Sequence, residues 1–406
     1  MPTVVLLGTL DTKGREYAFL ADRVREHGVE VLLVDAGILG EPLAEPHVRR
    51  EEVAAAAGAD VAALAEAGDR GGAVATMARG AAEVVRRLRA EGRLDGILGL
   101  GGSGGSSLVT EAMRALPVGV PKLMVSTVAS GDTRPYVGST DVTMTYSVVD
   151  IAGINELSAR ILTNAAGMIA GAVTAPPPPP GERKPLVVAS MFGVTTPCVT
   201  AARERLEELG YEVLVFHQTG AGGGSMEELL KAGYVAGSLD VTTTELCDEL
   251  VGGVFPAVPE RVESAGAAGV PQVVSVGALD MVNFGPLESV PERFRERTLY
   301  VHNPTVTLMR TTPAECAELG RVLARKLNAA TGPTALFLPL RGVSAIATAG
   351  QPFHDPEADE ALFAALRRDV DPARVEVHEL DTDVNDPAFA LALANRLHEL
   401  IDGGSR

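Results

Sequence analysis

Short apolar runs that alternate with amphipathic stretches are the feature that most constrains the fold of this chain. Residues 3–8 ("TVVLLG"), 29–37 ("VEVLLVDAG") and 94–102 ("LDGILGLGG") alternate with stretches of helical periodicity such as "REYAFLADRVREHG" at 15–28. Continuous Val, Ile and Leu runs of this length are typical of parallel strands that crossover helices bury on both faces. The pattern predicts a doubly wound α/β fold with a mostly parallel sheet.

The second half of the chain repeats this rhythm after a run of five prolines. Its apolar runs include "KPLVVASMFG" (184–193), "YEVLVFHQTG" (211–220) and "TALFLPLRG" (334–342), while "TAPPPPPGERKP" occupies 174–185. Consecutive prolines favour an extended polyproline II spacer, and each flanking part has the length of an ordinary domain. We therefore expect domains over 1–175 and 186–406, joined by a linker over 176–185, and the shared rhythm suggests two copies of one α/β plan.

Charge, cysteine content and the amino terminus exclude several classes of protein. The 406 residues carry a formal net charge of −18, which argues against binding to a nucleic-acid backbone. The chain has three widely spaced cysteines, Cys198, Cys247 and Cys316. This number and spacing fit neither a disulfide framework nor a metal site built from cysteines. The opening "MPTVVLLGTL" lacks the basic region of a signal peptide, and no run approaches the ~20 apolar residues of a membrane span. We expect a reduced, cytoplasmic protein.

Polar loops follow four of the expected strands in the first half. They are "GTLDTKG" (8–14), "DAGILG" (35–40), "GLGGSGGSS" (99–107) and "STVASGDTRPYVGSTD" (126–141). Ligands of open parallel sheets lie beyond the carboxyl ends of the strands, where the strand order reverses. We expect these loops to converge on one pocket.

The glycine-rich loop "GLGGSGGSS" has the composition of a phosphate site. Its glycines would let successive N–H groups turn inward as an anion-binding nest, while Ser103, Ser106 and Ser107 supply hydroxyls and cap a helix that begins near Leu108. The loop matches neither the Walker A nor the Rossmann spacing. A tight turn that needs glycine only for packing is the alternative.

Charged and hydroxyl residues in the other loops fit the same ligand. Lys13 could bind a phosphate as a point charge. The alternative is a purely structural role for this loop, in which Asp11 or Thr12 caps a helix beginning near Gly14 and Lys13 is solvated. Asp132 could position Mg²⁺ or bind a ribose hydroxyl, or it could simply stabilise a surface turn. Asp35 stands where doubly wound folds often bind a ribose hydroxyl, and it could equally cap the next segment.

A series of motifs extends through both halves: "LLGTLDTKGREYAF", "LGLGGSGGSS", "STVASGDTRPYVGSTD", "VFHQTGAGGGSMEELL" and "HNPTVTLMRTTPAE". In these motifs and their order the chain resembles the Tm-1-like ATP-binding family, the uncharacterised UPF0261 group. The resemblance implies two Rossmann-like domains, ATP held at the glycine-rich loops of the first, and a homodimer. The nucleotide-site candidates are Thr9, Asp11, Thr12, Lys13, Asp35, Gly101, Gly102, Ser103, Gly104, Gly105, Ser106, Thr127, Ser130, Gly131, Asp132 and Thr133.

The second half supplies a smaller set of candidates. "HQTGAGGGS" places His217 at a strand end before a second glycine-rich helix start, which is a second possible anion nest. His217 with His302 and either Asp240 or Asp280 could form an acid–base constellation, although hydrogen-bonded structural roles are the alternative for each. Cys198, at an apparent helix start, is interpreted as a small buried residue in preference to a nucleophile.

Three functional hypotheses follow from these residues. The first is an ATP-binding protein, with Mg²⁺ as an accompanying ion, that acts on an unidentified small molecule in a cleft between the domains, with His217 or Asp240 as base. The second is a nucleotide-sensing or scaffold protein in which ATP stabilises an assembly without chemistry. The third is an ATP-independent hydrolase or isomerase that uses the His and Asp residues of the second domain.

Overall fold

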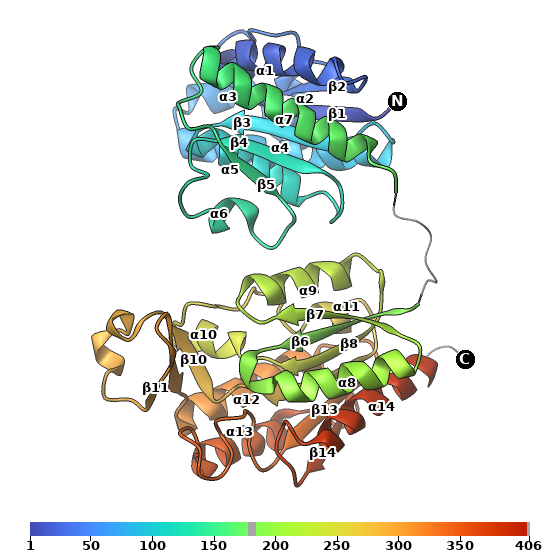
Figure 1. Cartoon of the computed structure of the whole chain (residues 1–406), viewed down its shortest axis with the longest axis vertical. Helices are drawn as coiled ribbons and strands as arrows, with labels where there is room; N and C mark the ends of the chain where they lie inside the picture. Colours follow the sequence, from blue (N-terminus) through green and yellow to red (C-terminus); the bar gives the residue numbers. More distant parts are fainter. Residues whose placement is uncertain (178–183, 404–406) are drawn as a thin grey trace. The chain divides into compact units, whose positions relative to one another are not determined.

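The chain divides into two compact units, Met1–Pro179 and Pro180–Arg406, in a computed structural model that describes residues 1–177 and 184–403 (Figure 1). The polyproline spacer expected over 176–185 falls mostly on residues 178–183, which lie outside the described residues. Each unit is an α/β domain with a parallel sheet at its centre, as the sequence predicts.

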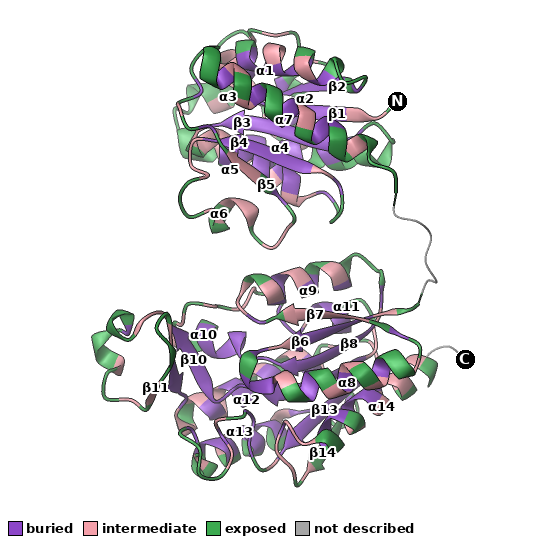
Figure 2. Ribbon diagram, viewed as in Figure 1, coloured by how far each residue is buried: buried purple, intermediate pink, exposed green. Residues whose placement is uncertain are grey.

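The first unit is built on a five-stranded sheet of order β2-β1-β3-β4-β5. Its strands are β1 (Thr3–Gly8), β2 (Glu30–Asp35), β3 (Gly96–Gly101), β4 (Lys122–Ser126) and β5 (Thr143–Tyr146). Every neighbouring pair is parallel, with Leu6 opposite Leu33 and Leu98. The strands β1, β3 and β4 are buried almost throughout (Figure 2). Their sequences are therefore continuous apolar runs, whereas a strand buried on one face would alternate apolar and polar residues.

Helices cover both faces of this sheet. They are α1 (Leu10–Arg25), α2 (Arg50–Ala56), α3 (Val61–Glu66), α4 (Arg70–Ala90), α5 (Ser103–Arg114), α6 (Arg134–Val137) and α7 (Glu156–Thr174). Val4 and Leu6 of β1 point to the face covered by α1 and α7, whereas Val5 and Leu7 point to the face covered by α2, α4 and α5 (Figure 1). This alternation follows from the two-residue side-chain period of a strand.

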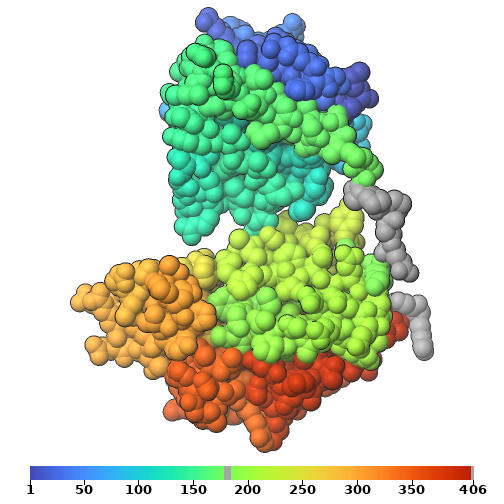
Figure 3. Space-filling model, viewed as in Figure 1, coloured from blue at the N-terminus to red at the C-terminus, as the bar shows by residue number. Residues whose placement is uncertain are grey.

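The second unit contains a six-stranded parallel sheet of order β14-β13-β9-β8-β6-β7. Its strands are β6 (Leu186–Met191), β7 (Glu212–His217), β8 (Val235–Thr242), β9 (Gln272–Gly277), β13 (Thr334–Pro339) and β14 (Val375–Leu380). A separate antiparallel sheet of order β10-β12-β11 comprises β10 (Met281–Phe284), β11 (Leu299–Asn303) and β12 (Val306–Arg310). Figure 3 shows the region around β11, in orange, projecting from the rest of this unit.

The helices of the second unit again lie on both sheet faces. They are α8 (Thr196–Glu208), α9 (Ala221–Lys231), α10 (Glu245–Val251), α11 (Ser264–Ala267), α12 (Pro313–Asn328), α13 (Pro356–Asp369) and α14 (Pro387–Gly403). One core joins the sheet to α8 and α14, and another joins it to α12 and α13. At the start of α12, Thr312 before the helix and Glu315 at its third position form a reciprocal capping box, and Pro313 occupies the first helical position, so this helix start is encoded locally.

The two parallel sheets have the same topology. When only the strands of each parallel sheet are counted along the chain, they lie in the order 2-1-3-4-5, and the second sheet adds a sixth strand beside the fifth. The switch points, where ligands of such folds bind, are therefore β1/β3 in the first unit and β6/β8 in the second. Within residues 1–177 and 184–403, no helix combines the length and the apolar character needed to cross a membrane.

Candidate functional site

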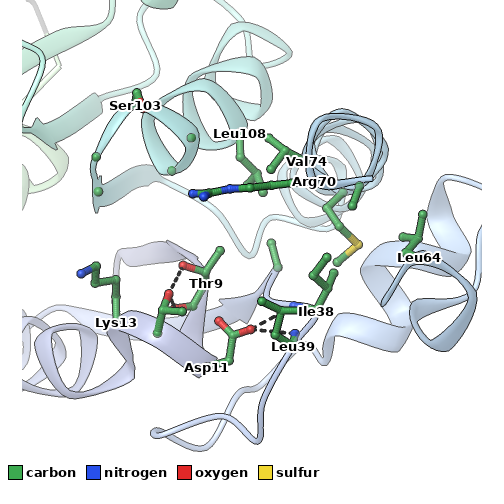
Figure 4. Close-up of a pocket in the computed structure, with 18 of the residues that line it drawn as sticks. Thr9, Asp11, Lys13, Ile38, Leu39, Leu64, Arg70, Val74, Ser103 and Leu108 are labelled. Carbon is green, nitrogen blue, oxygen red and sulfur yellow. Dashed lines mark hydrogen bonds between the residues drawn. The ribbon is translucent and has the colours of Figure 1, made fainter. Parts of the chain in front are cut away.

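The carboxyl ends of β1, β2 and β3 border a cavity of about 630 Å³ at the switch point of the first unit (Figure 4). This volume is within the range of small-molecule sites, roughly 300–1,000 Å³. Five groups line it: Thr9, Asp11, Thr12 and Lys13; Ala36, Ile38 and Leu39; residues 101–105 with Leu108; residues of α3, α4 and the turn between them, from Leu64 to Met77; and Asp150. The structure therefore brings the expected loops of β1 and β3 together.

Asp11 organises the cavity wall by holding the loop after β2. Its Oδ2 accepts the N–H groups of Ile38 at 3.1 Å and Leu39 at 2.9 Å. A Cβ on Gly37 would lie 2.6 Å from the Asp11 carboxylate, so this close approach requires glycine. Asp11 thus positions the loop that carries Ile38 into the cavity.

Lys13 reaches the cavity from the first turn of α1. Its ammonium group donates a hydrogen bond to the carbonyl oxygen of Ile151. A lysine ammonium has three N–H donors, and Ile151 accepts one of them. Lys13 is therefore held at the cavity by the protein while donors remain for a ligand.

The helix α1 begins earlier than the sequence indicates. It starts at Leu10, whose N–H donates to Asp35 Oδ1 at 3.0 Å, whereas a start near Gly14 was expected. Asp11 and Thr12 consequently lie inside the first turn, and neither caps the helix. The Thr9 and Thr12 hydroxyls pair with each other at 2.7 Å. The acceptor that replaces a local cap is 25 residues away in sequence, which is why a local pattern could not reveal it.

The glycine-rich segment forms a helix start where a nest was expected. The helix α5 begins at Ser103 and has no side-chain cap, so Gly104 and Gly105 lie in its first turn. The N–H groups of a first turn have no partners within the helix, and the helix dipole makes this end positive. Ser106 does not face a ligand as predicted, because it is buried and its hydroxyl bonds Ser126 Oγ at 2.6 Å.

Packing explains some of these glycines and leaves others unexplained. A Cβ on Gly99 would lie 2.4 Å from Val109 Cγ1, and one on Gly101 would lie 3.0 Å from Gly105 Cα. At Gly102, Gly104 and Gly105 the nearest atoms are 3.6, 4.0 and 3.6 Å away, which are ordinary contact distances. None of the three is among the glycines with positive φ. The fold therefore has room for a Cβ at each of these three positions.

Arg70 is a cavity residue that the sequence analysis missed. It is the first residue of α4, after Asp69, whose Oδ1 caps the helix by accepting the N–H of Gly72 at 3.0 Å. The Arg70 side chain extends across the cavity, and its Nη2 lies 4.0 Å from where a Cβ on Gly104 would be (Figure 4). Within the described parts of the chain, no hydrogen bond or ion pair engages its guanidinium. The motif "GDRGG" at 68–72 indicates a helix cap, but it does not indicate that the arginine side chain points into a cavity.

The opposite part of the cavity is apolar. Ile38, Leu64, Val74, Met77 and Leu108 contribute side chains from the β2 loop, α3, α4 and α5. The cavity thus combines a charged part, with Lys13, Arg70, the start of α5 and the carboxylates of Asp11, Asp69 and Asp150, and an apolar part suited to a flat apolar group.

Asp35 and the loop after β4 take other positions than the sequence indicated. Asp35 is fully buried, and its carboxylate accepts N–H groups of Leu10 and Gly37 and pairs with Arg50 at 2.8 Å. It therefore ties α1 to the β2 loop and offers no free oxygen to a ribose hydroxyl. Thr127 lies beside the start of α5, since its N–H donates to the Gly101 carbonyl at 3.2 Å.

Neither Thr127 nor the four other candidates of this loop line the cavity. These four are Ser130, Gly131, Asp132 and Thr133. Asp132 forms an exposed bidentate pair with Arg134, whose hydrogen bonds lower the pKa of Asp132 to about 2. This segment is therefore an exposed turn that a local ion pair stabilises, which is the alternative considered from the sequence.

In the second unit, the protein's own carboxylate occupies the second glycine-rich helix start. Glu245 Oε1 accepts the N–H of Gly220 at 2.6 Å and that of Gly223 at 3.2 Å. A Cβ on Gly223 would lie 1.9 Å from Glu245 Oε2, and one on Gly222 would lie 1.8 Å from the His217 carbonyl oxygen. The anion predicted for this nest is thus an internal side chain, and packing accounts for these glycines.

Asp240 is not available as a general base. Its Oδ1 accepts from Ser190 Oγ at 2.6 Å and from Arg261 Nη2 at 2.7 Å, and its Oδ2 pairs with Arg261 Nη1. Arg261 is fully buried and also contacts Glu227 and Glu245. Arg261 and its three carboxylate partners form a buried ion network, and this mutual pairing accounts for their presence without any role toward a substrate.

Within the described residues, no hydrogen bond or ion pair joins His217 or His302 to each other, to Asp240 or to Asp280. His217 is exposed beside the Phe192 ring, with 5.3 Å between ring centroids, and His302 is exposed on the separate antiparallel sheet. Burial raises the pKa of the Cys198 thiol to about 12, the opposite of what a nucleophile needs. In the part of the chain that the structure describes, no group of three or more His, Cys, Asp or Glu residues could hold a metal ion.

Comparison with known proteins gives the family. The N-terminal domain of uncharacterised protein family UPF0261 matches residues 2–178, and the C-terminal domain of the same family matches residues 184–401. A UPF0261 protein of Clostridium tetani is 53% identical over 98% of this chain and 99% of that protein. The ToMV resistance protein Tm-1 of Solanum lycopersicum is 40% identical over 98% of this chain and 56% of the tomato protein. This chain belongs to the UPF0261 family.

Solved structures are similar only at a low level. A UDP-N-acetylglucosamine 2-epimerase from Rickettsia bellii is 10% identical, with a TM-score of 0.25, over 99% of this chain and 96% of that chain. MurG of Acinetobacter baumannii is 12% identical, with a TM-score of 0.22, over 99% and 93%. Scores of this size carry no argument about function.

Proposed function

We propose that this UPF0261 protein binds a nucleotide, with ATP as the first candidate, in the cavity of the first unit. The observation that carries the proposal is the set Gly102, Gly104 and Gly105, where neither packing nor backbone conformation requires glycine. Glycine in a helix costs about 0.5–1 kcal/mol of stability relative to alanine. Bare backbone at a helix start, facing a cavity, has a use when a phosphate must approach the N–H groups closely.

The charges around the cavity support the same ligand. The phosphate chain would lie at the start of α5, between the Lys13 ammonium and the Arg70 guanidinium. Both groups bind phosphate well, lysine as a point charge and arginine through its planar fork. The base and ribose would lie against the apolar side formed by Leu64, Val74 and Met77.

Mg²⁺ would accompany the phosphates of the nucleotide. It is a hard cation that commonly binds one or two carboxylates together with substrate phosphates. The carboxylates that line the cavity are those of Asp11, Asp69 and Asp150. Asp132, the residue first considered for this ion, lies outside the cavity and is paired with Arg134.

Nucleotide binding without catalysis is the form of the proposal that the cavity supports best. Each lining carboxylate accepts backbone N–H groups: Asp11 from Ile38 and Leu39, Asp69 from Gly72, and Asp150 from Ile151. Within the described chain, each is engaged through one oxygen only, and Asp11 Oδ1 has no hydrogen-bond partner, which suits it to Mg²⁺. The lining residues include no histidine, the side chain that most often acts as a general base. We therefore favour a sensing or scaffold role over an ATP-driven reaction.

Isothermal titration calorimetry of Mg-ATP against the full chain tests the proposal. Gly104→Val places a branched side chain in the cavity, and Lys13→Ala removes one cation, so we expect each to weaken ATP binding roughly 10- to 100-fold. Gly171→Val is the matched control, because Gly171, like Gly104, lies in a helix, and it does not line the cavity. No described atom lies within 4 Å of the Gly171 Cβ position, and the Gly104 position has only Arg70 Nη2 at 4.0 Å. No heat and no thermal shift with the wild-type protein would refute nucleotide binding.

A further inference from the structure

The ladder between β1 and β3 ends before the two strands do. Leu6 opposite Leu98 is the last pair of this ladder. The pairing with the outer strands continues further, since β1 stays paired with β2 as far as Gly8 and β3 with β4 as far as Gly101. The two central strands therefore part at the switch point, next to the cavity that Thr9 and Gly101 line.

The hydroxyl of Tyr17 fills this split. Tyr17 is a fully buried residue of α1, and its hydroxyl donates to the Leu7 carbonyl oxygen at 2.5 Å and accepts the Leu100 N–H at 2.9 Å. In a parallel ladder of this register, the Leu100 N–H would donate directly to the Leu7 carbonyl oxygen. The hydroxyl thus stands within the hydrogen bond that would have extended the ladder by one pair.

The surroundings of Tyr17 keep its hydroxyl in this place. Burial raises the pKa of Tyr17, so the group stays protonated and can donate and accept at once. A Cβ on Gly8 would lie 2.0 Å from the hydroxyl oxygen, so the close approach of the ring to β1 requires glycine there. The chain therefore provides both the inserted group and the space for it.

A continued ladder would narrow the cavity at this point. The same register would place Thr9 opposite Gly101, and both residues line the cavity. Hydrogen-bonded strands lie about 4.8 Å apart, which is too close for a phosphate group to enter between two backbones. The width of the cavity between Thr9 and the start of α5 therefore depends on the split.

The switch point of the second unit is bridged differently. There the β6/β8 ladder ends at Ala189 opposite Leu239, and the hydroxyl of Ser190, the next residue of β6, accepts the Thr242 N–H at 2.8 Å. The Thr242 hydroxyl donates to the Ser190 carbonyl oxygen at 3.2 Å. The ends of β6 and β8 are thus joined by their own short side chains, whereas β1 and β3 are bridged by a side chain from a helix outside the sheet.

We propose that Tyr17 is a positioning residue of the nucleotide site, whose hydroxyl holds the ends of β1 and β3 apart and thereby admits a phosphate between Thr9 and the start of α5. This inference rests on the nucleotide site proposed above and deepens it. Tyr17 does not line the cavity, so it acts through the two strands and does not touch the ligand. Without the hydroxyl, the Leu7 carbonyl and the Leu100 N–H would be buried without a partner, and a closed ladder satisfies both.

Tyr17→Phe tests the inference, because it removes the hydroxyl and keeps the ring. We expect a crystal structure of the variant to show a direct hydrogen bond from the Leu100 N–H to the Leu7 carbonyl oxygen, with about 2.9 Å between N and O. Calorimetry of the full chain with Mg-ATP should show roughly tenfold weaker binding, which corresponds to the loss of one charge-assisted hydrogen bond to a phosphate. The melting temperature should change little, since the new backbone bond replaces the lost ones. A tyrosine with a merely structural role would give lower stability and unchanged affinity.

A rescue variant and a control variant separate the hydroxyl from other effects of the substitution. 4-Aminophenylalanine introduced at position 17 carries a polar group in the place of the hydroxyl, and it should bind ATP within about threefold of the wild type. Tyr211→Phe is the matched control, because Tyr211 is also buried, and its hydroxyl bonds the His398 ring at 2.9 Å in the second unit. It should leave ATP affinity unchanged.

The outcomes distinguish this inference from the nucleotide site itself. Unchanged ATP affinity in Tyr17→Phe, or strand ends that stay apart without the hydroxyl, would overturn the role of Tyr17 and leave the nucleotide site standing. An equal loss of affinity in Tyr211→Phe would do the same. Failure of ATP to bind the wild type would overturn both proposals.

Discussion

Replacing Gly104 by alanine should make the protein more stable while weakening its hold on a nucleotide. The nearest atom to a Cβ at this position is Arg70 Nη2 at 4.0 Å, so a methyl group fits without displacing the chain. Alanine removes backbone entropy from the unfolded state and has the higher helix propensity, together worth about 0.5–1 kcal/mol. For a domain of this size that corresponds to a rise of roughly 1–4 °C in the melting temperature.

Gly99, four residues before the first residue of α5, provides the opposite case. A Cβ there would lie 2.4 Å from Val109 Cγ1 and 3.2 Å from the Leu7 carbonyl oxygen. Overpacking of this kind costs about 1–3 kcal/mol, so Gly99→Ala should lower the melting temperature by several degrees. The two variants make the same chemical change in one glycine-rich segment, and only the surroundings differ.

Differential scanning calorimetry of the full chain resolves the effect if the transition of the first unit is followed separately, because a two-domain chain need not unfold in one step. ATP affinity is measured on the same preparations. A lower melting temperature for Gly104→Ala would show that the fold itself requires this glycine. It would also remove the observation on which the nucleotide proposal stands.

Three further predictions concern buried groups. Burial raises the pKa of Asp280 from 3.8 to about 6, so between these pH values the native state binds one proton more than the unfolded state. The free energy of unfolding should therefore fall as pH rises from about 4 to 6, and Asp280→Asn should flatten this slope in urea titrations at several pH values. Arg50→Ala leaves the buried Asp35 carboxylate without its cation, and we expect a loss of about 3–5 kcal/mol in the free energy of unfolding by urea. The Cys198 thiol, buried and with its pKa raised to about 12, should resist alkylation at pH 8 until the protein is unfolded, and rapid labelling of native protein would contradict its placement.

The fold could be predicted because its signals are local. Continuous apolar runs such as Val4–Leu7 identify strands buried on both faces, and the amphipathic stretches between them identify crossover helices. The separate antiparallel sheet was not predicted, since its strands are short and two of them, Met281–Phe284 and Val306–Arg310, are buried without a clear alternation. Thr9 to Lys13 and the glycines after β3 were recognised as neighbours because parallel strands end at one edge.

The sequence by itself determined the doubly wound plan of both units and two glycine-rich helix starts, one after β3 in the first unit and one after β7 in the second. Only the tertiary structure decided which start stays open. At the second, Glu245 lies 25 residues from Gly220 and fills the site with an internal carboxylate, while at the first the bare backbone faces a cavity and the unpartnered Arg70. The physical reason is that a glycine-rich pattern specifies a local backbone, whereas the group that meets its N–H donors is set by contacts between distant segments.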